Sequence, residues 1–200
     1  MIQFRNRLLA LRDADRALRA ELAQSGEPLG EYHPRLRGLH EANARELELI
    51  IDDEGWPTDE TSGADGAEAA WLLVMHAVSR PSFMRRCLGL LKSAASRGEV
   101  PARQAALLED RIRALEGRPQ RYGTQFHWSG GTLTPLAVED PVRVDELRRS
   151  VGLAPLAETL AAARAAAQSD GAPPLEEWEA SSNAMSRLAM EVGWRPPAAS

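Results

Sequence analysis

The sequence is short of the residue types that mark several common protein classes. One cysteine, Cys87, stands among 200 residues, which excludes an internal disulfide framework and a cysteine-based zinc site. Aromatic residues make up only 5% of the chain, and the prevalence of Ala, Leu, Arg and Glu favours helix over sheet. We expect Cys87 to be a packed thiol and not a nucleophile, because the sequence places no general base beside it.

Two further absences bear on partners and location. The formal net charge is −5, so there is no basic surplus for binding DNA or RNA, and we expect no nucleic-acid partner. No stretch approaches the roughly 18 apolar residues of a membrane span. The N-terminus carries charges where a signal peptide has an apolar block. These patterns predict a cytoplasmic protein without a membrane partner.

The spacing of apolar residues predicts a mainly α fold, a single helical domain with a small β-hairpin. An amphipathic helix over 2–25 dominates the N-terminal segment 1–30. A helical core domain follows at 31–167, with the hairpin near 122–137, and residues 168–200 form a linker and a helical tail. The N-terminal helix and the tail are the candidate surfaces for a homodimer. Further helices are predicted at 34–54, 67–78, 82–96, 101–116, from 141, at 155–167 and at 175–192, with a polar loop at 58–66.

Polar side chains interrupt the apolar faces of three predicted helices. His40 and Asn43 fall within one stripe, His76 ends the most apolar helix, and Arg111 lies between Leu107 and Leu115 on a third. Buried polar groups must find partners, so we expect these side chains to share one pocket. The segment leading into the hairpin adds Tyr122, Thr124 and Gln125.

The residue types in this pocket suggest acid–base chemistry. His76 and His40 would be the general acid and base, because histidine titrates near neutral pH. Arg111 would bind a carboxylate, a phosphate or a developing oxyanion. The leading hypothesis is a cofactor-independent enzyme that acts on a small or peptidic substrate. The candidate substrate-binding residues are Asn43, Trp56, Tyr122, Thr124 and Gln125.

Three alternatives remain open from the sequence. The histidines could simply bond to each other across a core, or the pocket could belong to a non-catalytic module that binds a small molecule or a peptide terminus. A metal-dependent hydrolase or oxygenase would use His40, His76 and a carboxylate. No compact metal motif is present, so no cofactor is predicted. The candidate carboxylates are Glu41, Glu68 and Asp110.

Several short motifs together resemble a bacterial family known only as a domain of unknown function. They are His40-x-x-Asn43, Gly55-Trp56-Pro57, the segment 66–77 (GAEAAWLLVMHA), Asp110-Arg111 and the segment 117–125 (GRPQRYGTQ). The resemblance covers about residues 36–160 and implies one central folding unit. It also implies a polar signature of His40, Asn43, His76, Arg111 and Gln125, but no activity. Met75 stands where the family often has Gln, which argues against an essential role at that position.

Overall fold

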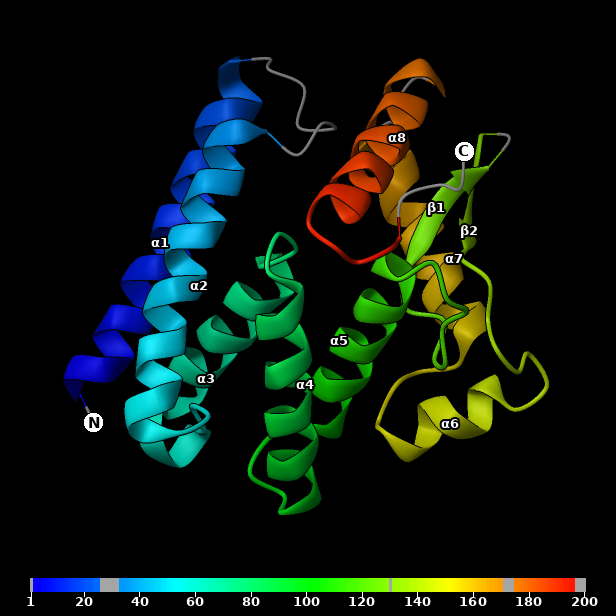
Figure 1. The fold of residues 1–200 in the computed structure, drawn as a ribbon. Coiled ribbons are helices and arrows are strands. Elements are labelled where there is room, and N and C mark those ends of the chain that lie inside the picture. Colours follow the sequence, from blue (N-terminus) through cyan, green and yellow to red (C-terminus); the bar gives the residue numbers. More distant parts are fainter. Residues whose placement is uncertain (1, 26–32, 130, 171–174, 197–200) are drawn as a thin grey trace.

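The computed structural model describes residues 2–25, 33–129, 131–170 and 175–196. Within these ranges the chain forms eight helices and one antiparallel hairpin (Figure 1), so the predicted mainly α fold is confirmed. The end of the N-terminal segment at 26–30, Gly130 of the hairpin and residues 171–174 of the expected linker lie outside the described ranges. The elements are α1 (Ile2–Ser25), α2 (Pro34–Glu54), α3 (Asp59–His76), α4 (Pro81–Ser96), α5 (Ala102–Leu115), β1 (Phe126–Ser129), β2 (Thr132–Pro135), α6 (Val144–Ser150), α7 (Leu156–Asp170) and α8 (Leu175–Glu191).

The hydrophobic core runs through the helices of the first half of the chain. Helices α1, α2 and α3 pack on one another, α4 pairs with α5, and α3 connects the two groups (Figure 1). Fully buried side chains such as Leu47, Val74, Leu91 and Leu108 belong to this single core. The hairpin lies beyond α5, and α7 packs against β2.

Helix α3 begins earlier than its composition predicts. Residues 58–66 were expected to form a polar loop, but the helix starts at Asp59. Thr58 and Thr61 form a capping box, which satisfies backbone N–H groups at this end. Gly63 has a φ of +72° and kinks the helix. Polar residues that look like a loop are therefore the cap and first turns of a helix that bends at a glycine.

Two buried charged side chains fix the segment that precedes the hairpin. Asp110 is fully buried and accepts hydrogen bonds from the backbone N–H groups of Arg121, Tyr122 and Thr124. Arg148, also buried, donates to the carbonyl oxygen of Tyr122 from the other side. The segment 121–124 is therefore held between a carboxylate and a guanidinium group.

Residues 194 and 195, which follow α8, dock on the core. The indole N–H of Trp194 donates to the carbonyl oxygen of Val78 at 2.6 Å, and the Arg85 guanidinium lies 4.7 Å from the Trp194 ring centroid. Arg195 donates to the carbonyl oxygens of Ala114 and Leu115, at the end of α5. Cationic donors suit this position because the last carbonyl groups of a helix lack internal partners.

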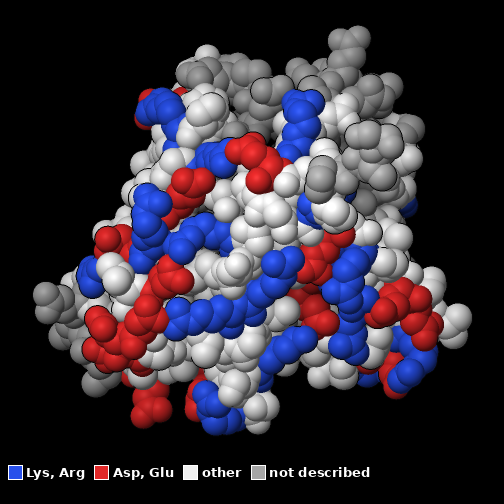
Figure 2. All heavy atoms as spheres, in the orientation of Figure 1, with Lys and Arg blue, Asp and Glu red and all other residues white. Residues whose placement is uncertain are grey.

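Charges of both signs are mixed on the face of the molecule that Figure 2 shows. Exposed ion pairs such as Arg7–Glu46 and Arg86–Asp52 join neighbouring helices. Among the described residues, no helix combines the length and the apolar character that crossing a lipid bilayer requires.

Candidate functional site

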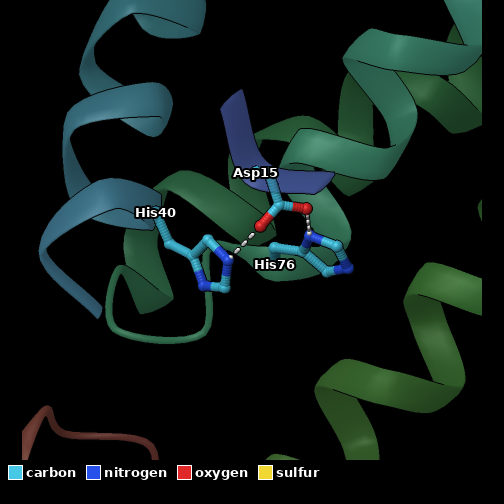
Figure 3. A group of neighbouring side chains, drawn as sticks. All are labelled: Asp15, His40 and His76. Carbon is cyan, nitrogen blue, oxygen red and sulfur yellow. Dashed lines mark hydrogen bonds and ion pairs between the residues drawn. The ribbon is translucent and has the colours of Figure 1, made fainter. Parts of the chain in front are cut away.

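Asp15 of α1, His40 of α2 and His76 of α3 meet where these three helices pack together (Figure 3). One carboxylate oxygen of Asp15, Oδ1, lies 2.7 Å from His40 Nε2. The other, Oδ2, lies 2.9 Å from His76 Nδ1. The two imidazole ring centroids are 5.0 Å apart. We refer to Asp15, His40 and His76 as the Asp–His cluster.

The position of Asp15 follows from the apolar pattern of α1. Leu8 and Leu22 are fully buried, and Asp15 lies seven residues from each, on the same face of the helix. Asp15 therefore occupies a core position that an apolar residue would normally fill. On α2, His40 is likewise buried among apolar residues. Each buried polar group thus finds its partner on a neighbouring helix.

Burial distinguishes the three members of the cluster. The side chains of Asp15 and His40 are each 1% exposed, whereas that of His76 is 19% exposed. A molecule in solution therefore reaches the cluster through His76, and Asp15 and His40 lie behind it.

The pKa of Asp15 lies well below its ordinary value. Burial alone would raise this pKa, because it penalises the charged form. The hydrogen bonds from His40 and His76, together with the charges of His76 and Arg19, outweigh burial and lower it. Asp15 is therefore an anion at neutral pH, and it can only accept hydrogen bonds.

The pKa of His76 is lowered from its ordinary value. Burial is the largest cause, and the contacts with Asp15 oppose it without reversing it. A neutral imidazole has one N–H group and one acceptor nitrogen. Because the Asp15 carboxylate accepts, Nδ1 of His76 carries the proton and Nε2 carries the lone pair. Figure 3 shows this second ring nitrogen on the side of the ring away from Asp15.

Arg19 lies one helical turn beyond Asp15 and contacts the same carboxylate. Its Nε atom lies 3.3 Å from Oδ1 and 3.4 Å from Oδ2 of Asp15. Its charge lowers the pKa values of both Asp15 and His76. Arg19 thereby balances the buried negative charge and favours the neutral form of His76.

The cluster also has the composition of a metal site. One ligand atom from each of Asp15, His40 and His76 lies within 4.8 Å of the others. Two imidazoles and a carboxylate suit zinc and non-haem iron. The metal-site alternative from the sequence used a carboxylate other than Asp15. Of its three candidates, Glu41 pairs with Arg37, Glu68 is exposed, and Asp110 binds the segment before the hairpin.

Two of the predicted substrate-binding residues are buried. Asn43 is buried, and its side-chain amide donates to the carbonyl oxygen of Leu11 at 3.3 Å, which ties α2 to α1. Trp56 is a member of the hydrophobic core and is 7% exposed. That Asn43 and Trp56 contact a substrate stays a prediction.

Arg111 and Gln125 line a different cavity. Arg111 Nη1 lies 3.5 Å from Gln125 Oε1, and both residues face a cavity between α5, the hairpin and α8. No residue of α1, α2 or α3 is among the described residues that line it. The structure thus brings His40 and His76 together and places Arg111 elsewhere. Tyr122 is buried, and the backbone N–H groups of Tyr122 and Thr124 bind Asp110.

The residue that sequence reasoning missed is Asp15. Its signal was present, because residues 8, 11, 15, 18 and 22 alternate spacings of three and four, and only position 15 is not leucine. His40 was predicted from the same pattern, a polar residue within the apolar stripe of a helix. The difference is that aspartate is common on exposed helix faces, whereas histidine is rare in this chain, with four copies.

Comparison with known proteins places the chain in one family. A search of curated proteins and a search of solved structures each gave no match. A family model described as a family of unknown function, DUF6624, matches residues 2–170. The match extends beyond the expected span of about 36–160 and includes α1, and with it Asp15. The chain therefore belongs to the DUF6624 family of unknown function.

Proposed function

We propose that the protein is an enzyme that uses His76 as a general acid–base group on a small or peptidic substrate. The observation that carries this proposal is the contact of His76 Nδ1 with the buried carboxylate of Asp15. A carboxylate in this position orients the imidazole and stabilises the imidazolium that forms when Nε2 accepts a proton.

Each member of the Asp–His cluster has a distinct role in this proposal. His76, the most exposed member, exchanges a proton with the substrate. Asp15 fixes the tautomer of His76, and His40 holds the second oxygen of Asp15 in place. The lowered pKa of His76 keeps the imidazole neutral, and therefore basic, near pH 7. The chemistry requires no group beyond these side chains.

A turnover screen tests the proposal. Acyl esters, dipeptides and phosphate monoesters would be incubated with the wild-type chain and with a His76→Gln variant. We expect turnover of at least one class, and a loss of about a hundredfold or more in the variant. His33→Gln is the matched control, because His33 lies at the N-cap of α2, outside the cluster. Turnover that His76→Gln leaves intact, or no turnover of any class, would contradict the proposal.

A metal-dependent enzyme is the second candidate, supported by the spacing of the ligand atoms in the Asp–His cluster. In that case Asp15, His40 and His76 would bind a divalent ion such as Zn²⁺ or Fe²⁺. Arg19 weighs against it, because its positive charge already lies against the Asp15 carboxylate. Equilibrium dialysis of untagged protein against Zn²⁺, followed by elemental analysis, separates the candidates. One equivalent of zinc that Asp15→Asn abolishes would favour the metal site.

A further inference from the structure

A cavity of about 630 Å³ lies between α5, the hairpin and α8, apart from the Asp–His cluster. Its size falls within the range of about 300–1,000 Å³ that is typical of sites for small organic ligands. Arg111 and Leu115 of α5 form one wall, Trp128 and Leu133 of the hairpin a second, and Met185 of α8 contributes to a third.

The described charged groups that line this cavity share one sign. Arg111, Arg118 and Arg195 line it, and among the described residues no Asp or Glu side chain does. Each of these cations also contacts a group of the protein. Arg118 pairs with Glu116, and Arg195 donates to the carbonyl oxygens at the end of α5. Arg111 donates from Nη1 to the side-chain oxygen of Gln125 at 3.5 Å.

The remainder of the lining is largely apolar. The hairpin presents Phe126, Trp128 and Leu133 to the cavity, Leu136 lies just after β2, and Met185 faces the cavity from α8. A bare inorganic anion would leave these side chains without a partner. A ligand that matches both parts of the cavity has an anionic head and an apolar body.

We propose that this cavity binds a small organic carboxylate with an aromatic or aliphatic body. The Arg111 guanidinium binds the carboxylate through its planar set of N–H donors. The Gln125 amide lies beside it and adds a polar contact. Trp128 and Leu133 pack against the body of the ligand. The carboxylate belongs either to a free acid or to the terminus of a short peptide.

This inference stands apart from the proposed function. The described lining contains no residue of α1, α2 or α3, so the cavity does not include the Asp–His cluster. Met185, Ser186 and Arg195 lie beyond residue 170, where the family match ends. The C-terminal segment of this chain therefore supplies part of the binding site.

Titration of the full-length, ¹⁵N-labelled chain tests the proposal. The probes are octanoate and indole-3-acetate, each with its neutral amide as a counterpart, together with inorganic phosphate. A dipeptide that ends in leucine represents a peptide terminus. We expect at least one of the two acids or the dipeptide to shift the resonances of Arg111, Gln125 and Trp128. Each amide should bind at least about tenfold more weakly than its acid.

Three variants identify which side chains bind the carboxylate ligand. Arg111→Gln should weaken binding of the acid by about tenfold or more. Arg143→Gln, which removes an exposed cation paired with Glu146, should have no effect. Leu133→Trp should block binding by filling the cavity, and it serves as the test if Arg111→Gln does not fold.

Four outcomes would overturn the proposal. They are the absence of binding by all three carboxylate probes, equal binding of an acid and its amide, phosphate binding as tight as that of the acids, and resonance changes confined to the Asp–His cluster. None of these outcomes contradicts turnover by His76, so failure here is distinct from failure of the proposed function.

Discussion

The carboxylate of Asp15 lies 2.7 Å from His40 Nε2, a ring nitrogen 25 residues further along the chain. Both side chains are buried, so neither can exchange this contact for water without opening the core. The same carboxylate also contacts His76, and this second contact turns a buried polar pair into a candidate for chemistry.

Replacing Asp15 with asparagine should lower the free energy of unfolding by about 3 kcal/mol. The substitution keeps the shape of the side chain but removes a buried charge to which two imidazoles donate. Urea denaturation measures the change. The matched control is Asp13→Asn, since Asp13 is exposed and pairs with its neighbour Arg12. If both variants lose the same small amount, Asp15 does not stabilise the junction of the three helices.

The free energy of unfolding should decrease in two steps as the pH is lowered. The pKa of His76 is lowered on folding, so the unfolded chain takes up this proton first. The free energy of unfolding therefore decreases as the pH falls below about 6.5, by at most ~1.4 kcal/mol per pH unit. The pKa of Asp15 is also lowered, so its contribution is intact above about pH 4 and is lost below it.

Urea titrations between pH 4 and 8 measure the upper step. His76→Gln should flatten the curve between pH 7 and 5, because the group that titrates there is gone. His33→Gln provides the comparison, since His33 lies at a helix cap outside the cluster. An unchanged slope in His76→Gln would show that another group causes the upper step.

Asp110→Asn should destabilise the protein by about 2–3 kcal/mol. An asparagine amide would place N–H donors opposite the backbone N–H groups of residues 121, 122 and 124, which now bind the carboxylate. Thermal or urea unfolding measures the loss. Asp52→Asn, at an exposed ion pair with Arg86, should change stability by less than about 0.5 kcal/mol. Similar effects for the two variants would contradict the structural role of Asp110.

Cys87 should be unreactive in the folded protein. It is completely buried, and burial raises the pKa of its thiol to about 12. Only the thiolate reacts with disulfide reagents. Labelling with Ellman's reagent at pH 8 should therefore be slower than for an unfolded chain by about a thousandfold. It should become rapid in urea at the concentration that unfolds the protein. Rapid labelling of the native chain would show that the thiol is accessible.

Local patterns predicted most of the helices but not all of their boundaries. The stripes of α1 and α2 are regular enough to locate both helices within a residue or two. The start of α3 was missed because cap residues and a loop have the same composition. What distinguishes them is the hydrogen bonding of Thr58 and Thr61, which depends on the backbone conformation.

The candidate site was only partly predictable for a similar reason. His40 and His76 stood out because polar residues rarely interrupt an apolar stripe. Their shared partner on α1 depends on how three helices pack, which no single stripe encodes. Arg111 also interrupts a stripe, yet its neighbours come from the hairpin and α8. Sequence spacing predicts which side chains face inward, but tertiary packing decides which of them meet.

Because Asp15 is on α1, the chemistry of His76 depends on how the N-terminal helix packs against its neighbours. A motion that lifts α1 from both α2 and α3 breaks both imidazole contacts, and the pKa of His76 then loses the effect of the Asp15 carboxylate. The Asp–His cluster thus also holds α1 against α2 and α3. A substitution that weakens the packing of the buried residues Leu8 or Leu22 would therefore change the proton affinity of His76, although neither residue belongs to the Asp–His cluster.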